Sequence, residues 1–320
     1  MAKANPVIEP GAVPNAQATW SLGASTLGPP RTLWGDAWRR FRRHKLAMVG
    51  AAMLIFFVLA TLLGPLVYRV DRDAMDVQAM MTGSTLVHPM GTDDLGRDLL
   101  SRAIFGGRVS IAVGLTAMLI SILVGTLVGA SAGFLGGIVD QLLMRFTDMF
   151  LALPQLPLLL LTIFLFRDPL RKNFGPEVGI FVLIVTVIGL LNWMPTARIV
   201  RASFLSLKQK EFVEAANCIG VSRIAIMFRH ILPNAMGPII VSATLGVGAA
   251  IITESVLSFL GLGFPPDTPT WGRLLFDGQN YLEIAPHMVL WPGLLIFLTV
   301  LSINYMGDGL RDALDPRSRL

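Results

Sequence analysis

The chain has 320 residues, of which 53% are hydrophobic and only 15% are charged. Soluble domains usually carry about 25% charged residues, so this deficit indicates that much of the surface faces lipid. The formal net charge of +5 does not indicate nucleic-acid binding, because the cations lie beside apolar runs and not among aromatic residues on a polar domain. The single cysteine, Cys218, excludes an internal disulfide, and its spacing from the four histidines matches no metal site.

Six apolar runs are long enough to cross a bilayer, which takes about 20 mostly apolar residues. The first run follows a basic stretch and exceeds the core of a cleavable signal, so we interpret it as a retained span. The sequence therefore predicts an all-α, polytopic membrane protein with six transmembrane helices. The expected spans are residues 46–68, 109–132, 142–165, 178–197, 235–258 and 288–306.

The N-terminal part of the chain has two sections before the first span. Residues 1–30 are rich in Ala, Pro and Gly without a period, which predicts a disordered tail. Residues 31–45 place Trp34, Trp38 and Phe41 at helical spacing among arginines, a pattern typical of an amphipathic helix on the membrane surface. The alternative is a solvated basic tail. The remaining units are then the amphipathic helix with the first span (31–68), a periplasmic segment (69–108), a five-helix core (109–306) and a C-terminal tail (307–320).

Proline and glycine indicate how the spans bend and pack. Pro154 interrupts the third run and Pro195 ends the fourth, which membrane helices tolerate where neighbouring groups bind the freed carbonyls. Gly125, Gly129 and Gly133 repeat every four residues along the second run. Small residues on one stripe predict a close helix–helix contact.

The distribution of Lys and Arg predicts the orientation. If the N-terminus is cytosolic, 17 of the 26 cations fall on the cytosolic side, including six in the loop of residues 198–234. The positive-inside rule then favours cytosolic N- and C-termini.

The loop of residues 198–234 contains the sequence EFVEAANCIG, which predicts a short helix. Gly220 follows it at the place where a left-handed residue commonly ends a helix. Two central alanines leave little side-chain bulk, so another surface can come close. One apolar face is expected at helical spacing, formed by Phe212, Ala215, Ala216 and Ile219.

A second helix is expected directly after this turn. Ser222 can cap its start, and Pro233 marks where it should bend or stop. The flanking spans and the scarcity of cations exclude DNA binding by this helix–turn–helix. A loop that rests on the membrane without a partner remains an alternative. The second helix carries its own apolar stripe, Ile224, Met227, Phe228 and Ile231.

The sequence GTDDLGRDLLSR follows the first span and is rich in charge. Asp98 and Arg102 stand four residues apart with the acid first, which predicts an ion pair. Thr92 or Asp93 can cap the helix that follows, and Gly96 allows a tight turn. The segment is either a docking face at the pore mouth or a self-capped surface loop. Its candidate residues are Gly91, Thr92, Asp93, Gly96, Arg97, Asp98 and Arg102.

Charged residues inside apolar runs are candidates for function, because a charge at a membrane helix centre costs about 2.5–3.5 kcal/mol. Arg145 and Asp148 lie three residues apart at the cytosolic edge of the third span, which favours a helix-anchoring pair over a functional site. Glu254, near the outer end of the fifth span, has no partner nearby in sequence and is a candidate to face the transport pathway. Pro154 completes these membrane-embedded candidates.

Several of these residues together carry a family resemblance. Glu214-Ala215-Ala216 followed by Gly220 and then Leu232-Pro233 resembles the EAA loop of ABC importer permeases. In that family the loop forms a coupling helix that docks into a cleft of the ATPase subunit. These six positions and His230, which replaces the isoleucine of the family pattern, are the residues that the resemblance assigns to ATPase coupling.

Four further blocks resemble C-type permease subunits of dipeptide and oligopeptide importers. They are residues 88–110, 133–154, 258–275 and 306–317, so the resemblance extends from about residue 34 to the end. It implies the type I ABC importer permease (MetI-like) fold, with an N-terminal span added to five core helices. It also implies alternating access as the transport mechanism.

The resemblance also implies partners. These are a second, B-type permease, two ABC ATPase subunits that bind ATP and Mg, and a periplasmic or lipid-anchored substrate-binding protein, all at the bacterial inner membrane. This chain has no phosphate-binding GxxxxGK[ST] loop, so we expect no catalytic residue, cofactor or metal in it. Di- or oligopeptides are the expected substrates, and glutathione, nickel complexes and opines are the alternatives.

Two other classes make different predictions. An ion-driven secondary transporter predicts inverted repeats and paired broken helices with buried acids, and no convincing repeat is found. An integral-membrane enzyme predicts a nucleophile–base or metal constellation, and neither GxSxG nor HExxH occurs.

Overall fold

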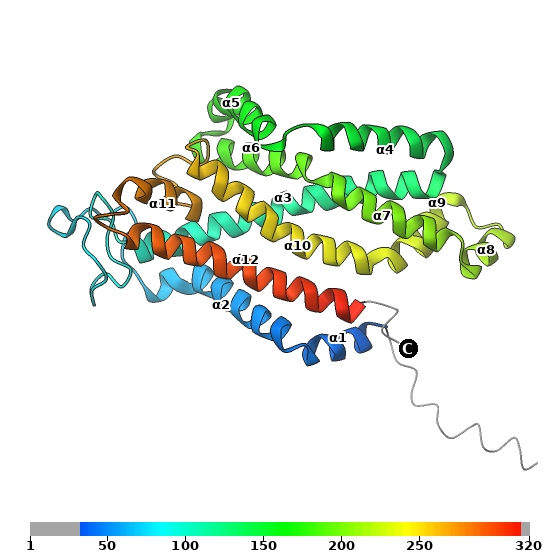
Figure 1. Ribbon diagram of the computed structural model, residues 1–320, viewed down its shortest axis with the longest axis horizontal. Coiled ribbons are helices and arrows are strands. Elements are labelled where there is room, and N and C mark those ends of the chain that lie inside the picture. The colour runs from blue at the N-terminus through cyan, green and yellow to red at the C-terminus, as the bar shows by residue number, and fades with distance from the viewer. Residues whose placement is uncertain (1–32, 315–320) are drawn as a thin grey trace, which may run out of the picture.

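The computed structural model describes residues 33–314, and no β-strand occurs within that range. The predicted tail of residues 1–30 lies outside the described residues, as do residues 315–320. Figure 1 shows the long helices side by side along one axis, with α8 at one end and α11 at the other. These two ends are called the bracket end and the α11 end below.

Within the described residues, four helical segments are long and apolar enough to cross a membrane, or six if each of two bent pairs counts as one span. The six expected runs all fall on these segments. The single segments are α2 (Lys45–Val67), α3 (Leu99–Leu135), Arg223–Phe259 and α12 (His287–Leu314). The pairs are α4 (Gly137–Ala152) with α5 (Gln155–Phe174) and α6 (Pro176–Leu191) with α7 (Trp193–Lys208).

The segment Arg223–Phe259 has three parts, α9 (Arg223–Ala225), the π-helical turn η2 (Ile226–Ile231) and α10 (Leu232–Phe259). The shorter elements are α1 (Leu33–Arg43), η1 (Val77–Ala79), α8 (Glu211–Cys218), α11 (Trp271–Gly278) and η3 (Gln279–Tyr281).

The helix α3 lies at the centre of the bundle and packs against α2, α6, α7 and α10. A Cβ atom added at Gly125 would lie 2.7 Å from Thr196, and one added at Gly133 would lie 2.7 Å from Phe204. The predicted glycine stripe is therefore the contact of α3 with α7, and this expectation is confirmed. The helix begins at Leu99, so the last ten residues of the segment expected at 69–108 are helical.

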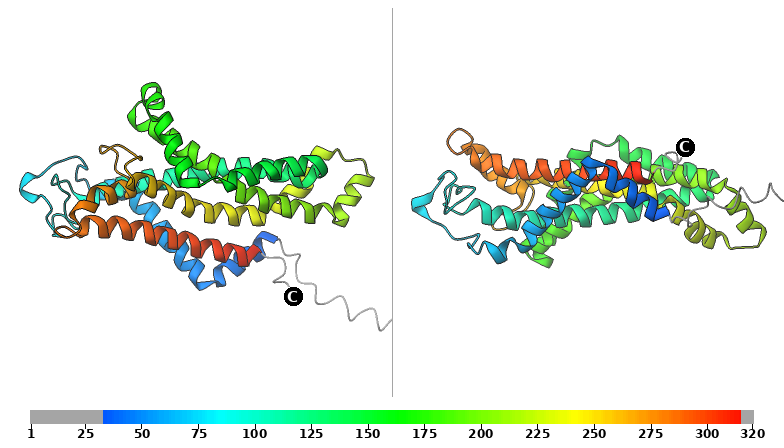
Figure 2. Two further views of the ribbon diagram at one scale, coloured as in Figure 1. Left: turned by 45° about the horizontal axis from the view of Figure 1, so that its top comes forward. Right: turned by 90° about the horizontal axis from the view of Figure 1, so that it is seen from below.

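Two of the expected spans are broken. The third bends by 86° between α4 and α5, where Pro154 precedes the first residue of α5. In the left view of Figure 2, α5 leaves the bundle as the green helix. The fourth was expected to end at Pro195, which is wrong. The chain bends by 41° at Asn192, and Pro195 lies in the first turn of α7, where a helix has no need of its N–H.

The first and last helices pack together at the bracket end. Phe41 of α1 is buried with Ala47 of α2 and Ala313 of α12, so the expected amphipathic helix has a packed side. Trp38, whose ring stacks on that of Phe41, is 60% exposed. The helix α12 continues to Leu314, and thus includes the first eight residues of the expected tail.

Candidate functional site

The connection from α7 to α10 forms a helical bracket, residues 209–231, beyond the end of the bundle (Figure 1). The helix α8 ends in a left-handed residue, because Gly220 has a φ of +77°. Its N–H donates to the Asn217 carbonyl at 3.0 Å, and the Val221 N–H donates to the Ala216 carbonyl at 3.1 Å. These two bonds form a Schellman motif, so the predicted left-handed helix end at Gly220 is confirmed. The predicted cap is also present, since Ser222 Oγ accepts the Ala225 N–H at 3.4 Å.

The apolar face predicted for α8 is divided between two sides. Val213 and Ala216 are buried, at 1% and 4% exposure. Phe212 and Ile219 are 39% and 80% exposed, and Ala215 lies between them on the exposed side. The expectation of one shared face was wrong, because the adjacent interior of the protein takes the Val213 side. The helix therefore presents an exposed apolar face that no described residue covers.

The second helix of the bracket also differs from its predicted stripe. The Leu232 N–H donates to the Met227 carbonyl five residues earlier, which is the pairing of a π-helix. The wider turn buries Ile226 and Ile231, which are five residues apart, and leaves Phe228 45% exposed. Of the two outcomes predicted at Pro233, a bend or a stop, the stop is wrong, because Pro233 lies in the first turn of α10 and the segment continues to Phe259.

One apolar cluster joins the bracket to the spans. Val213 and Ala216 of α8 pack in it with Phe204 of α7 and Ile231 of the π-helical turn, and Ile239 of α10 belongs to the same cluster. Because interiors are close-packed, a displacement of α8 acts directly on α7 and α10.

Ion pairs fix α4 to α7 beside this cluster. Arg201 donates from Nε and Nη2 to the two carboxylate oxygens of Asp140, at 2.5 and 2.6 Å. Asp148 pairs with Arg198 of α7 at 2.5 Å. The predicted pair of Asp148 with Arg145 was therefore wrong. Asp148 pairs with an arginine of the neighbouring helix α7 instead.

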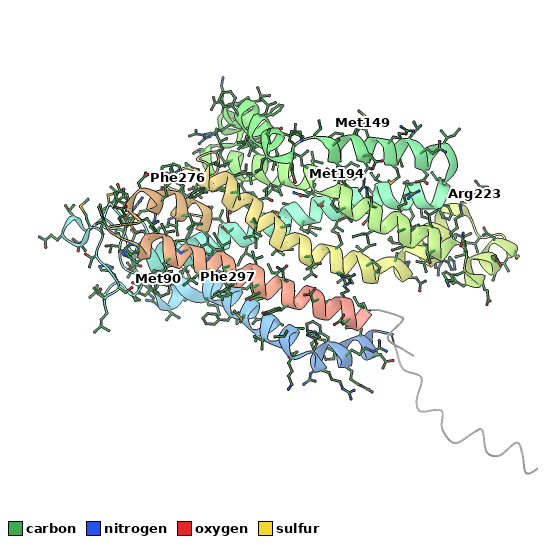
Figure 3. All side chains as sticks on the ribbon, viewed as in Figure 1. Met90, Met149, Met194, Arg223, Phe276 and Phe297 are labelled. Carbon is green, nitrogen blue, oxygen red and sulfur yellow. The ribbon has the colours of Figure 1, made fainter. Side chains whose placement is uncertain are left out.

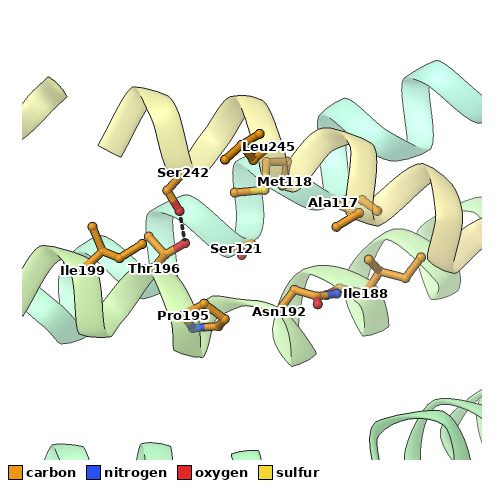
Figure 4. A pocket seen from close by; sticks show the side chains of 13 residues that line it. Ala117, Met118, Ser121, Ile188, Asn192, Pro195, Thr196, Ile199, Ser242 and Leu245 are labelled. Carbon is orange, nitrogen blue, oxygen red and sulfur yellow. Dashed lines mark hydrogen bonds between the residues drawn. The ribbon is translucent and has the colours of Figure 1, made fainter. Parts of the chain in front are cut away.

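A cavity of about 300 Å³ lies between α3, α6, α7 and α10 (Figure 4). Its wall is mostly apolar, with a few small polar groups. The hydroxyl groups of Thr196 on α7 and Ser242 on α10 are hydrogen-bonded at 3.0 Å across it. Asn192, at the bend between α6 and α7, and Ser121 of α3 also line the cavity. None of these residues was a candidate from the sequence.

At the α11 end, Asp98 is the N-cap of α3. Its carboxylate accepts the Ser101 N–H at 2.7 Å and the Tyr68 hydroxyl at 2.8 Å, and lies 2.8 Å from His88 Nδ1. The expected pair with Arg102 and the expected caps Thr92 and Asp93 were wrong, because the N-cap position turns this carboxylate toward the helix start. Burial and the bond to Asp98 raise the pKa of Tyr68.

The turn before α3 closes on itself. Asp93 Oδ1 accepts the N–H groups of Leu95 and Arg97, both at 2.9 Å, and Arg97 Nε donates to Asp93 Oδ2 at 2.7 Å. Gly96 has a φ of +75°, and a Cβ there would overlap the Asp76 backbone, so the predicted tight turn is confirmed. Gly91 also has a positive φ, and Thr92 is fully buried.

Arg102 ties three segments together at this end. Its side chain is 0% exposed, and Nη2 donates to the Pro266 carbonyl at 3.3 Å. Three carboxylates, those of Asp73, Asp93 and Asp277, lie 3.7–3.9 Å from its nitrogens. Burial raises the pKa of Asp277 in α11, while Arg273 and Arg102 act to lower it. The arrangement agrees with a self-capped segment.

Glu254 is enclosed and does not line the cavity. Its side chain is fully buried, Ser258 Oγ donates to Oε1 at 2.7 Å, and Ser110 Oγ donates to Oε2 at 3.2 Å. The Trp271 N–H donates to the same Ser110 oxygen at 3.2 Å. The structure places Glu254 inside the protein, between α3, α10 and α11. No group of three or more His, Cys, Asp or Glu within residues 33–314 is placed to hold a metal ion.

Comparison with known proteins identifies the family. Residues 121–320 match the family described as "Binding-protein-dependent transport system inner membrane component". The chain belongs to this family. Residues 32–86 of the permease match a second family, the N-terminal TM domain of oligopeptide transport permease C.

Curated relatives match nearly the whole permease. It is 42% identical to the oligopeptide transport system permease protein OppC of Escherichia coli K12, over 90% of this chain and 93% of the relative. It is 40% identical to OppC of Haemophilus influenzae, over 90% of each chain. It is 38% identical to the glutathione transport system permease protein GsiD of Escherichia coli O6:H1, over 93% and 96%.

A solved structure supports the fold. The inward-facing MetNI methionine ABC transporter matches with a TM-score of 0.52 and 18% identity, over 68% of this chain and 98% of the matched chain. The expected MetI-like fold is thereby confirmed.

Two of the three groups of candidate residues lie at opposite ends of the permease. Glu214, Ala215 and Ala216 lie in α8, and the others assigned to coupling lie in the turn and helix that follow. The residues from Gly91 to Arg102 lie at the opposite end (Figure 1). The sequence missed the cavity, because its small polar residues come from separate helices. The only local signal was the polar Asn192 just before Pro195.

Proposed function

We propose that this permease is a membrane subunit of an ATP-driven importer of di- and oligopeptides, with the bracket as its contact with an ATPase subunit. The relatives named for oligopeptide transport support the peptide class. The relative named for glutathione supports it as well, because glutathione is itself a tripeptide. Nickel complexes and opines remain the alternative cargo.

The exposed face of α8 is the observation that carries the proposed ATPase contact. Phe212, Ala215 and Ile219 form it, and an exposed apolar patch on a polar end of a membrane protein favours a protein partner. Ala215 at its centre has only a methyl group, so a cleft in the ATPase can approach the helix backbone closely. Each of the two ATPase subunits would take one such helix, one from this chain and one from a second, B-type permease.

The bracket end is proposed to be cytosolic. The bias of Lys and Arg supports this orientation, as does the position of the arginine-rich α1 at the same end of the molecule (Figure 1). The α11 end then faces the substrate-binding protein, and both termini are cytosolic.

The proposed mechanism follows from the packing. Closure of the ATPase dimer draws the bracket toward its counterpart, and the shared apolar cluster passes this displacement to α7 and α10. These two helices line the cavity and meet there through Thr196 and Ser242. We propose that the cavity is part of the transport pathway. The displacement of α7 and α10 would open this pathway alternately to each side of the membrane.

A pair of matched variants tests the docking face. Ala215→Trp places an indole on the exposed face, and Asn217→Trp places the same group on an exposed position of another face. We expect Ala215→Trp to lower peptide uptake and peptide-stimulated ATP hydrolysis by about tenfold, which corresponds to about 1.4 kcal/mol. Asn217→Trp should leave both unchanged. Both rates are measured with the reconstituted importer, after equal insertion of the two variants has been verified. Normal coupling in Ala215→Trp would show that the ATPase does not dock here.

A further inference from the structure

A second cavity, of about 270 Å³, lies between α2, α3 and α12 toward the α11 end. Its walls are almost wholly apolar and include Phe57 and Ala60 of α2, Ile104 of α3 and Leu295 of α12. The indole of Trp271 forms part of its floor. Met90, labelled in Figure 3, also lines it. None of the residues that line the cavity of Figure 4 belongs to this groove.

Close helix contacts and bound carbonyls hold the groove in shape. A Cβ at Gly107 would lie 2.6 Å from the Trp271 ring, so α3 reaches the floor closely at this point. Pro65 has no N–H to offer the Thr61 carbonyl, which a helix would otherwise bind four residues on. Arg108 replaces that donor, because its Nε donates to the Thr61 carbonyl at 2.6 Å and its Nη2 to the Leu62 carbonyl at 2.7 Å. The course of α2 along the groove is therefore fixed.

The groove has no free polar group for water. Thr61 and Tyr68 contribute the hydroxyls of its lining, and both are engaged, Thr61 with the Val58 carbonyl and Tyr68 with Asp98. A water needs two to four polar partners, so a cavity of this kind stays dry and is suited to an apolar ligand.

The mouth of the groove continues the membrane-facing surface. Phe56 and Val67 belong to its lining and are 65% and 88% exposed along the span α2. Arg69, directly after the lining residue Tyr68, exposes its side chain at the end of that span. An apolar channel that ends at a cation is complementary to a lipid tail that ends at a phosphate.

We propose that this groove binds one acyl chain of a phospholipid from the leaflet at the α11 end, with the phosphate at Arg69. The bound chain lies against Trp271, whose Nε1 donates to the Ala103 carbonyl at 2.9 Å and whose N–H donates to Ser110. Trp271 is the first residue of α11, so the lipid supports the contact of α11 with α3. The proposal does not depend on the transported substrate or on the ATPase contact.

A photoreactive lipid tests the proposal. The assembled importer is placed in membranes that contain a phosphatidylglycerol with a diazirine in the middle of one acyl chain, and adducts are mapped by mass spectrometry. We expect adducts on Phe57, Ala60 and Leu295 well above those on Leu119, an α3 residue that is 62% exposed. Equal labelling at Leu119 would mean ordinary lipid contact only and would overturn the proposal.

Three variants sharpen the result. Ala60→Phe fills the groove and should lower its labelling several-fold, whereas Leu59→Phe, at a neighbouring exposed position, should not. Arg69→Gln should lower the labelling less than Ala60→Phe does. If the isolated permease is labelled in the groove and the assembled importer is not, a partner subunit fills the groove and the proposal is wrong. The wild-type pattern decides the question even if Ala60→Phe does not fold.

Discussion

The two ends of the permease differ in how far their side chains find partners within the chain. At the α11 end, Asp98 caps α3 and Arg102 lies wholly enclosed among three carboxylates, so charge is paired within the chain. At the bracket end, one side of α8 is packed and the other exposes Phe212 and Ile219. The comparison indicates that charges at the α11 end are paired within the chain, whereas α8 leaves one apolar side uncovered.

The largest expected effect breaks the bracket. Gly220→Pro is incompatible with a φ of +77° and removes the N–H that donates to the Asn217 carbonyl, so the native turn loses about 3 kcal/mol or more. We expect the variant to insert normally and to lose most of its peptide uptake. Gly220→Asn, which tolerates a left-handed backbone better, should retain much more uptake. Uptake and membrane insertion are measured in parallel, and normal uptake in Gly220→Pro would remove the bracket from the mechanism.

Arg102→Gln is expected to lower peptide uptake less than Gly220→Pro does. It is expected to lower the stability of the permease strongly. Loss of this cation removes the group that joins Asp93 to Asp277, which then keep only Arg97 and Arg273, and breaking a buried pair typically costs about 3–5 kcal/mol. Unfolding of the purified permease by denaturant measures the loss. Arg39→Gln, at an exposed position of α1, serves as the control. If the two variants were equally stable, the α11 end would not be held together by its charges.

The smallest effect is expected beside the bracket, where Asp140 of α4 pairs with Arg201 of α7. Both groups are partly exposed, so a double-mutant cycle with Asp140→Asn and Arg201→Gln should give a coupling free energy of about 0.5–1 kcal/mol. A value as large as the loss in Arg102→Gln would show that this pair, and not the packing around it, fixes α4.

The spans were predictable because hydropathy depends on composition alone. The beginning of α3 was not, since residues 99–108 include Arg102 and Arg108, whose partners lie in other segments. Each arginine lowers the local hydropathy, although one is enclosed and the other binds backbone carbonyls of α2. A partner that is distant in sequence leaves no mark in a local window.

The turn of the bracket was predictable from the sequence. Which faces of its helices are buried was not. Gly220 and Ser222 act through their own backbone neighbourhood, so their spacing was sufficient. Which side of α8 is buried depends on Phe204 and Ile231, which α7 and the π-helical turn supply. The π-helical turn holds about one residue more than an α-helical turn, just before Pro233. A regular helical period in the sequence therefore does not predict which of its residues are buried.

The central claim is that the exposed face of α8 meets an ATPase subunit. Ile219→Cys in a Cys218→Ser background places one thiol on that face, and Leu86→Cys in the same background places one on a fully exposed position near the α11 end. Each thiol is labelled with a photoreactive maleimide in the assembled importer. The account predicts an adduct with the ATPase subunit from position 219 and none from position 86. An ATPase adduct from position 86, or its absence from position 219, would contradict it.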